Sequence, residues 1–339
     1  MRFERFDPSA AESRLRACYE LVAEAQRVDD PNAPPDSFGA FRGWWIYGMA
    51  GIPQQTWLAM SDSGALVGCY VLELPERENR ANASLFPFVT LSARRRGVGT
   101  ALVAHAAEQS ERAGRVLLMS NARVDAPGAA FAAAIGARAS LPYARRVLDL
   151  GDALRARLPG LRADAAAQGA GYTLRRWTGP APDDLVEQVC SLFMAMEDAP
   201  HEDSVEPFRW DPARLRAAEE RGLAQGSRWY EVAAIHDGSG DMAALTQVEV
   251  DPDVDAWARQ DITAVARPHR GHHLGLAVKV AMVDWLADAE PQVRQIHTFN
   301  AVQNDHMIAV NTDLGYRISD YFDSFELDVA AAPKLVAAR

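Results

Sequence analysis

Two short stretches of the chain place arginine and glycine directly before an apolar helical pattern. Residues 91–99 read LSARRRGVG and residues 267–275 read RPHRGHHLG. A glycine-containing turn that opens a helix presents unpaired backbone N–H groups and the positive end of the helix dipole, which together bind anions. In the first stretch, Gly97 and Gly99 leave the backbone open to a diphosphate. Positive charge around it comes from Arg94, Arg95 and Arg96.

Neither stretch matches a common nucleotide-binding motif. The sequence has no GxGxxG after its first strand pattern and no GxxxxGK[ST]. A diphosphate bound at these turns is therefore expected to belong to another carrier.

The turns resemble the [R/Q]xxGx[G/A] cofactor loop of the GNAT superfamily of acyl-CoA-dependent acyltransferases. The first turn fills all three positions of that motif, with Arg94, Gly97 and Gly99. In the second turn Arg270 and Gly275 fit, but His273 stands where the middle glycine is expected. The exchange keeps the backbone donors and requires the loop to accommodate a larger side chain. The tandem layout is similar to that of mycothiol synthases.

The resemblance implies acetyl-CoA, or another short acyl-CoA, as co-substrate, and it implies no metal. Two neighbouring parallel strands would part, and the free backbone beside the gap would pair with the pantetheine arm. In the second half the arm is expected along Val265, Ala266 and Arg267. The adjoining turn and helix start would hold the diphosphate, through Arg270, Gly271, His272, His273, Leu274, Gly275, Leu276 and Ala277.

A second cofactor segment is implied by the stretch HTFNAVQNDHMIAVNTDLGYR, which is closer to the superfamily's pattern than MSNARVDAPGAAFAAAIGAR in the first half. Its expected cofactor residues are Asn300, Asn304 and Met307. The corresponding cofactor residues of the first half are Arg94, Gly97, Val98, Gly99 and Thr100.

Direct attack of an amine on a thioester requires a donor for the oxyanion and an acceptor for the amine proton. The first candidate acceptor is Glu249, which shares a strand face with Gln247 in LTQVEV. The second is Asp261, at the start of the strand that leads into the second turn. The alternative for both is a solvated carboxylate at a strand end.

Many members of the superfamily use a tyrosine on the last short helix as general acid. The matching positions hold Asn311 in the second half and Ala132 in the first. Neither side chain can act as a tyrosine does, so the leaving thiolate needs water or another donor.

The loop MEDAPHEDSVEP carries five carboxylates in the region that covers the acceptor site in the superfamily. This density suits a cationic amine, and the alternative is an ordinary solvated acidic loop. Tyr230 is expected to contact the acceptor beside it. The expected substrate residues of the loop are Glu197, Asp198, His201 and Glu202.

Three histidines of the second turn, His269, His272 and His273, favour phosphate contacts over a metal site. No carboxylate or cysteine joins them at ligand spacing. The three cysteines are scattered and form neither a CxxC nor a zinc motif.

Each half of the chain shows the same order of elements. A helical stretch, an acidic proline-containing loop and a second helix precede two or three strands. A strand then ends in the arginine turn, and a helix, a strand and a short helix that closes in glycine follow. The order indicates a duplication. We expect an α/β fold of two tandem GNAT-like domains, each a mixed, mostly antiparallel sheet with a splayed parallel strand pair, flanked by helices. The expected ranges are 1–150, a linker at 151–170, 171–330 and a tail at 331–339.

Composition limits the classes of partner. The 339 residues are 48% hydrophobic and 24% charged, with a formal net charge of −11, which argues against a nucleic-acid or anionic-membrane partner. No stretch approaches the apolar length of a membrane span, and the N-terminus lacks a signal-peptide core. We expect a cytoplasmic protein, a monomer or homodimer.

The combined expectation is an N-acetyltransferase that moves an acetyl or short acyl group from acyl-CoA to a primary amine of a small molecule. The second domain is expected to be catalytic and the first degenerate or structural. Two alternatives stay open, namely a non-catalytic acyl-CoA sensor and a mycothiol synthase-like enzyme that acetylates a cysteinyl glycoside. A third, an aminoacyl-tRNA donor, is disfavoured by the acidic balance.

Overall fold

The chain folds into two compact units. The computed structural model describes residues 1–48 and 52–332. Unit 1 contains residues 1–142 and 202–206 and the chain from 321 onward, and unit 2 contains residues 143–201 and 207–320. Each unit has its own sheet and its own hydrophobic core.

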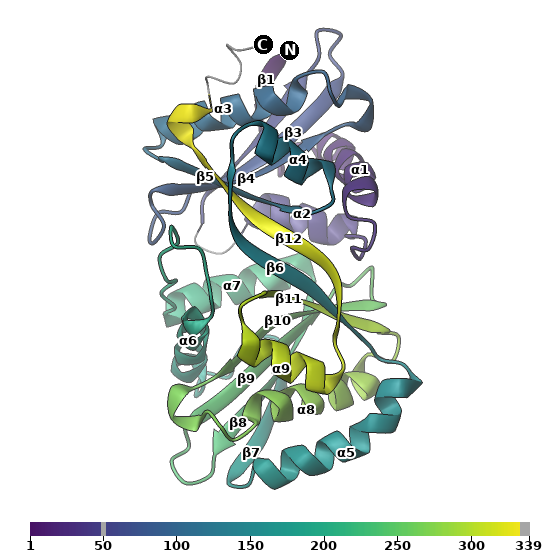
Figure 1. Cartoon of the computed structure of the whole chain (residues 1–339), viewed down its shortest axis with the longest axis vertical. Helices are drawn as coiled ribbons and strands as arrows, with labels where there is room; N and C mark the ends of the chain where they lie inside the picture. Colours follow the sequence, from purple (N-terminus) through teal and green to yellow (C-terminus); the bar gives the residue numbers. More distant parts are fainter. Residues whose placement is uncertain (49–51, 333–339) are drawn as a thin grey trace. The chain divides into compact units, whose positions relative to one another are not determined.

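The sheet of unit 1 has the strand order β1-β2-β3-β4-β5-β12 (Figure 1). Its neighbours pair antiparallel, except for the parallel pair β4 and β5. The strands are β1 (Arg2–Phe6), β2 (Gln54–Met60), β3 (Leu66–Glu73), β4 (Asn82–Val89), β5 (Leu117–Arg123) and β12 (Arg317–Asp328). Strand β3 is apolar almost throughout (LVGCYVLE), and because successive side chains point to opposite faces, both faces of the sheet contribute to a core.

Helices lie on both faces of this sheet. The core between the sheet and α3 (Val98–Arg112) includes Tyr70, Leu72 and Leu102. The core on the other face gathers apolar residues of α1 (Glu12–Asp29) and α2 (Phe38–Tyr47). The short helix α4 (Pro127–Ala134) follows β5.

The sheet of unit 2 repeats this plan, with the order β6-β11-β10-β9-β8-β7. Here β10 and β11 form the parallel pair. The strands are β6 (Arg138–Asp149), β7 (Tyr172–Thr178), β8 (Arg228–His236), β9 (Met242–Val250), β10 (Trp257–Val265) and β11 (Gln295–Ala301). The expected splayed parallel pair is therefore present in both units.

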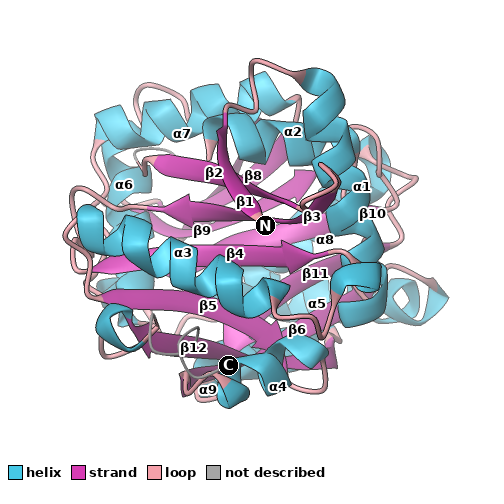
Figure 2. Cartoon of the chain, turned by 90° about the horizontal axis from the view of Figure 1, so that it is seen from above, coloured by secondary structure: helices cyan, strands magenta, loops and turns pink. Residues whose placement is uncertain are grey.

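Two helix layers cover the sheet of unit 2. One face packs against α5 (Asp152–Gln168) and α8 (Leu274–Ala289), and the other against α6 (Val186–Ala195) and α7 (Pro212–Gln225). The short helix α9 (Asp305–Leu314) contacts α8. Figure 2 shows the strands enclosed by helices.

The last strand of each half of the sequence belongs to the unit built by the other half. Strand β12 pairs with β5, from Phe322 opposite Arg123 to Asp328 opposite Leu117. Residues 143–149 of β6 pair with β11. The units thus differ from the expected ranges 1–150 and 171–330, because the sequence pattern reports a strand but not its partner.

The expected linker at 151–170 is the helix α5, and it is part of the core. Leu154 and Leu158 are 5% and 6% exposed and pack in the cluster that contains α8. Of the expected tail at 331–339, residues 333–339 lie outside the described structure.

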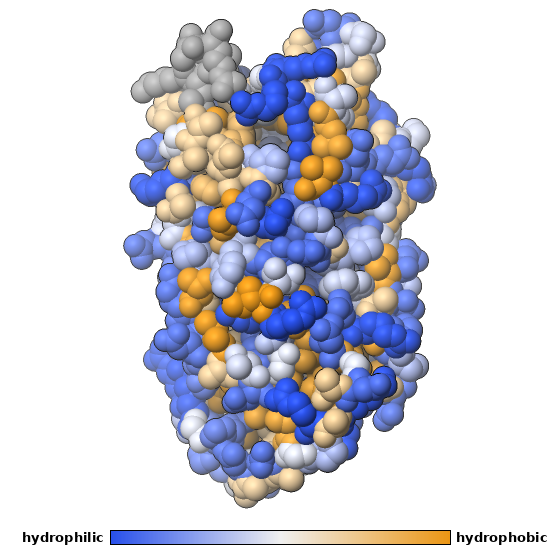
Figure 3. All heavy atoms as spheres, turned by 45° about the vertical axis from the view of Figure 1, so that its right-hand side comes forward, coloured by the Kyte–Doolittle hydropathy of each residue, from blue (hydrophilic) through white to orange (hydrophobic). Residues whose placement is uncertain are grey.

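The surface is mainly polar on the face drawn in Figure 3, where hydrophobic residues form small separate groups. Among the described residues, no helix combines the length and apolar character needed to cross a membrane.

Candidate functional site

The parallel strands of each unit part after three residue pairs. In unit 2 the pairing covers Trp257–Arg259 against Gln295–His297, although β10 continues to Val265 and β11 to Ala301. In unit 1 it covers residues 82–84 against 117–119, although β4 continues to residue 89. Each unit therefore has a gap with unpaired backbone on both edges, beside the arginine turn.

The two turns share one backbone conformation. Each follows a 3₁₀ helix, η1 (Leu91–Ala93) or η3 (Arg267–His269), and leads into α3 or α8. Two residues of each turn have positive φ, and they are Arg95 (62°) and Gly97 (82°) in unit 1, and Gly271 (88°) and His273 (53°) in unit 2. Glycine therefore occupies the second left-handed position of the unit 1 loop and the first left-handed position of the unit 2 loop.

His273 takes the left-handed conformation that Gly97 takes in the first loop. Both residues are N-caps of the following helix, and neither helix has a side-chain cap in the described structure. The N–H groups of the first turns of α3 and α8 are therefore open to an anion. The larger side chain changes the strain of the loop but not its backbone geometry.

An aspartate holds the leading arginine of each loop. In unit 1 Asp29 makes two bonds with Arg94, each 2.7 Å long. In unit 2 Asp198 accepts from Arg270 Nη2 at 2.5 Å and from Arg267 Nε at 2.9 Å. These hydrogen bonds, the one from Arg267 foremost, hold the pKa of the Asp198 carboxyl well below its usual range.

Two expected roles change as a result. Asp198, predicted to bind the acceptor amine, instead holds the cofactor loop. Arg94 and Arg270, predicted to surround a diphosphate, are each tied to an aspartate and to the strand before the loop, where Arg270 Nε donates to the Val265 carbonyl at 3.3 Å.

The rest of the acidic loop is divided between the two units. Glu197 and His201 belong to unit 2, whereas residues 202–206, including Glu202, belong to unit 1. Within unit 1, Asn79 donates its backbone N–H to Glu206 at 3.1 Å, and Ser204 donates to Glu326 at 2.6 Å. The five carboxylates of the loop therefore do not all belong to one unit.

Tyr230 does not face the acceptor side. Its hydroxyl donates to Glu290 at 2.5 Å, and its ring packs edge-on against Trp285 of α8. Burial and the hydrogen bond to Glu290 raise the pKa of Tyr230 to about 12. Because side chains alternate along a strand, the next residue, Glu231, points to the other face, towards α6 and α7.

Strand β10 carries a bulge where the parallel strands part. Its register with β9 shifts between Gln260 and Thr263. The carbonyl of Ile262 accepts from Thr246 Oγ1 at 3.1 Å and from Gln260 Nε2 at 3.0 Å, so side chains satisfy the backbone of the bulge. A bulge of this kind changes the direction in which side chains and backbone N–H groups point along the edge of a strand.

Thr263 directs its N–H into the gap. Ala266 N donates to the Ala243 carbonyl at 2.8 Å, so in an antiparallel ladder the N–H groups of Val265 and Thr263 point away from β9. The corresponding residue of β4, two before the strand end, is Pro87, which has no N–H. The register of β3 and β4 is continuous, from Gly68 opposite Val89 to Glu73 opposite Ser84.

Both predicted proton acceptors bind one arginine. Arg259 lies directly opposite Glu249, forms an ion pair with it, and places Nη1 3.1 Å from Asp261 Oδ1. Burial, with the nearby charge of Glu249, raises the pKa of Asp261 to about 6. Burial opposes ionisation of Glu249 as well, but Arg259 outweighs it and lowers the pKa of Glu249.

Two buried titratable residues on the same face were missed by the sequence analysis. Glu231 is 2% exposed, Gln247 donates to its Oε1 at 2.8 Å, and burial raises its pKa to about 8. His297 lies opposite Arg259 at the last pair before the gap, and burial lowers its pKa to about 4. In the described structure Glu231 Oε2 and His297 Nδ1 have no hydrogen-bond partner. The sequence signal for Glu231 was a glutamate in the middle of the otherwise apolar strand segment WYEVAAI.

In the expected second cofactor segment, the side chain of Asn304 makes a hydrogen bond within the protein. Its Oδ1 accepts from the Met307 N–H at 3.1 Å and caps α9. Asn300 Oδ1 accepts from Asn311 Nδ2 at 2.8 Å. Asn311 in turn accepts from the buried Lys279 of α8 at 2.6 Å, a contact that the sequence analysis did not anticipate.

Unit 1 contains a cavity of about 430 Å³ beside its gap. Residues of β4, β5 and α4 line it together with Arg94, Gly97, Gly99 and Thr100 of the loop. The first loop therefore opens onto a cavity large enough for part of a cofactor.

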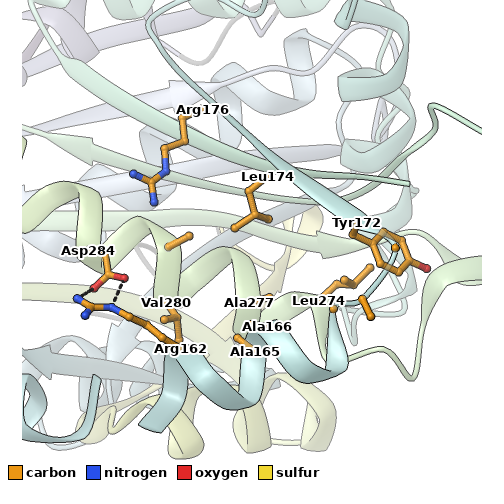
Figure 4. A pocket seen from close by; sticks show the side chains of 14 residues that line it. Arg162, Ala165, Ala166, Tyr172, Leu174, Arg176, Leu274, Ala277, Val280 and Asp284 are labelled. Atoms are coloured by element: carbon orange, nitrogen blue, oxygen red, sulfur yellow. Dashed lines mark hydrogen bonds and ion pairs between the residues drawn. The ribbon is translucent and has the colours of Figure 1, made fainter. Parts of the chain in front are cut away.

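A second pocket, of about 470 Å³, lies in unit 2 but not at the gap (Figure 4). It lies between α5, β7 and α8, and its wall includes Leu174, Val280 and the ion pair of Arg162 with Asp284. No residue of β10 or β11 lines it, but Leu274 and Ala277, two of the expected cofactor residues of α8, do.

Known structures share this arrangement. The chain is 29% identical to a tandem GNAT protein from the clavulanic acid biosynthesis pathway, solved without acetyl-CoA, with a TM-score of 0.80 over 97% of this chain and 98% of that one. A GCN5-related N-acetyltransferase from Sphaerobacter thermophilus shares the fold at 16% identity, with a TM-score of 0.66 over 96% of both chains. A scan of family models and a search of curated proteins gave no match.

The paired turns, the paired gaps and this similarity over the whole length define the class. The chain is a tandem member of the GNAT superfamily. The similarity supports a general acetyltransferase function.

Proposed function

We propose that the protein transfers an acetyl or other short acyl group from acyl-CoA to a primary amine of a small molecule, and that unit 2 is the catalytic unit. The observation that carries the proposal is the gap between β10 and β11, which opens at a bulge and ends at the N-terminus of α8. A thioester arm in that gap finds backbone donors, and a diphosphate finds the helix N-terminus.

The bulge provides the acyl-transfer geometry. The pantetheine arm pairs with the free edge of β10, and the Thr263 N–H stabilises the oxyanion that forms when the amine attacks. Asp261 takes the amine proton, because a carboxyl with a pKa of about 6 is ionised at neutral pH yet basic enough to accept it. The ranking of Glu249 over Asp261 is therefore reversed in our proposal.

The carboxylates on the α6 and α7 face suit a cationic acceptor. Glu249 and Asp261 lie on that face in adjacent strands, and Glu231, with a pKa raised to about 8, adds a mostly neutral carboxyl beside them at pH 7. An ammonium group that approaches them is attracted. It gives one proton to solvent to become the free amine, and the amine then loses its second proton to Asp261 as it attacks. Nothing in this arrangement requires a nucleic acid, a membrane or a metal.

In the proposal unit 1 is not catalytic. Pro87 deprives β4 of the N–H that Thr263 offers in β10, and the register of β4 shows no shift at the corresponding position. The cavity beside Gly97 favours a second role for unit 1, which is to bind acyl-CoA without turning it over. A chain that did this in both units would be an acyl-CoA sensor.

The test combines a ligand count with turnover. Mass spectrometry of the intact complex with acetyl-CoA counts ligands per chain, and release of free CoA is followed with a panel of small primary amines. Gly275→Val adds a branched side chain to the first turn of α8, where a Cβ would lie 3.7 Å from Val265 Cγ2 and 3.8 Å from Val310 Cγ2. Gly99→Val is the matched change in unit 1.

We expect Gly275→Val to abolish CoA release and Gly99→Val to leave it intact. Loss with Gly99→Val alone would assign catalysis to unit 1. Binding of acetyl-CoA without release of CoA to any amine would favour the sensor.

A further inference from the structure

Lys279 is buried in the core of unit 2. It is 1% exposed and lies in α8, whose sequence LGLAVKVAMVDWL is apolar on every side of the helix. Its ammonium lies 4.7 Å from the centre of the Tyr316 ring and 2.6 Å from Asn311 Oδ1. A methionine would fill the same volume without the cost of burying a charge.

The bond to Lys279 fixes the direction of a chain of hydrogen bonds. An ammonium can only donate, so Asn311 must accept through Oδ1 and present its Nδ2. Asn311 Nδ2 donates to Asn300 Oδ1 at 2.8 Å, so Asn300 in turn presents its own Nδ2. Every bond of the chain points the same way, from Lys279 towards Asn300, and each donor polarises the next.

The chain ends at the gap. Asn300 is in β11 three residues beyond His297, where β10 no longer pairs with β11, and its side chain is half-buried. Within the described structure its Nδ2 donates to no other residue. The chain thus places an N–H donor, backed by a buried cation, on the strand segment that borders the gap.

We propose that Lys279 and Asn311 are positioning residues that hold Asn300 as the donor for the departing CoA thiolate. The inference rests on the proposed function, and it deepens it by naming the group that supports the leaving sulfur. Asn311 occupies the position at which many superfamily members have the tyrosine. In this proposal it links Lys279 to Asn300 and does not act as a general acid.

The reaction step balances without a proton from the chain. The amine nitrogen forms a bond to the thioester carbon, the C–S bond breaks, and its electron pair leaves on sulfur. The amine proton goes to Asp261. The thiolate accepts a hydrogen bond from Asn300 Nδ2 and departs as an anion, and Lys279 keeps its proton throughout.

The charge of Lys279 makes the chain sensitive to pH. Burial lowers its pKa to about 7. The groups that face it are Asn311 of α9 and the neutral phenol of Tyr316, whose pKa burial raises. Above that pKa Nζ is neutral and can accept a hydrogen bond as well as donate one. The direction of the hydrogen-bond chain is then no longer fixed, and activity should decline.

The experiment compares Lys279→Met and Asn311→Leu with Met282→Leu, a change of a buried α8 residue outside the chain. For the two chain variants we expect kcat to fall about 10- to 100-fold with KM for acetyl-CoA unchanged. An acetyl thioester of a more acidic thiol should recover most of the loss, because its thiolate needs less support. Lys279→Met should also lose the decline of kcat at alkaline pH.

A readout without turnover is the ionisation of bound CoA. The wild-type chain should lower the pKa of the CoA thiol, measured by thiolate absorbance, and Lys279→Met should raise it by about one unit, a tenfold change in thiolate population. Thermal unfolding checks that the variant folds.

Unchanged kcat and unchanged dependence on the leaving thiol in both chain variants would overturn the inference while the proposed function stands. If wild type binds CoA but acetylates no amine, the proposed function fails, and the thiol titration still decides whether the chain acts on sulfur.

Discussion

Single residues on one sheet face set the chemistry of unit 2. Arg259 ties the two predicted proton acceptors together, and the difference between them follows from their surroundings. Asp261 is buried beside the negative Glu249, which raises its pKa to about 6, whereas Arg259 favours the charged form of Glu249. Two carboxyls that look alike in sequence therefore have pKa values shifted in opposite directions.

Asp261 should give the pH profile an acidic limb. The carboxyl accepts a proton only when ionised, so kcat/KM should rise as the pH increases through about 6, on the acidic side of the decline expected from Lys279. Asp261→Asn should remove the limb and most of the activity. Glu249→Gln should move it to lower pH, because a negative neighbour that raises the pKa of Asp261 is gone. A limb that stays in place in both variants would exclude Asp261 as the base.

Backbone conformation decides the effect of a glycine substitution in the loop. Gly97 has φ of 82°, whereas Gly160 lies inside α5, and a Cβ would meet nothing within 4 Å at either site. Gly97→Ala should lower the free energy of unfolding by about 1 kcal/mol, and the control Gly160→Ala should raise it by about 0.5–1 kcal/mol. Chemical denaturation measures both. Effects of equal sign would contradict this account.

At the scale of elements, the strand, turn and helix of each unit share one design, which we propose as an anion site. The end of a helix region supplies an aspartate, which is Asp29 as the last residue of α1 and Asp198 just after α6, and the turn supplies the arginine. The bond holds the turn against the helix region in both units. The backbone N–H groups of α3 and α8 are left to meet the diphosphate.

Asp198→Asn should free Arg267 and Arg270 for the cofactor. We expect KM for acetyl-CoA to fall several-fold at low ionic strength and to depend more steeply on salt, because two cations near the diphosphate lose their partner. Asp183→Asn, which removes an exposed partner of Arg216, is the control. A rise of KM in Asp198→Asn would mean that the aspartate is needed to shape the loop.

For the whole molecule, the exchange of last strands makes each unit depend on both halves of the sequence. Unit 1 needs β12 to cover the edge of β5, and its core includes Leu327 and Val329. Unit 2 needs residues 143–149 of β6 beside β11. The exchange thus couples the folding of the two halves.

A fragment of residues 1–150 should therefore not fold alone. It lacks β12, so the edge of β5 and part of the core are exposed, and we expect aggregation or a loss of cooperative unfolding. Co-expression with residues 151–339 should yield a soluble complex on size-exclusion chromatography. A monomeric fragment with cooperative unfolding would show that the exchanged strand is dispensable.

Local features were predictable because they depend on neighbours in the sequence. The turns, the helices that follow them and the parallel strands that part beside them arise from glycine placement and from hydrophobic periods. Even His273 adopts the conformation that the motif requires, since the loop ends on both sides are fixed. The alternation in RWYEVAAIH shows that Tyr230 and Glu231 point to opposite faces of the sheet. The prediction of Tyr230 as the residue beside the acceptor selected the face that packs against α8, whereas Glu231 lies on the other face.

The sequence by itself determined the fold class, the duplication and the two anion-binding turns, since each is encoded by residues that are close in the chain. Tertiary structure decided which unit receives each last strand, that Asp198 binds the loop, and that Lys279 reaches Asn300 through Asn311. These depend on pairings between residues tens to hundreds of positions apart. A sequence pattern gives the face of a strand or helix, but only packing gives the partner that the face meets.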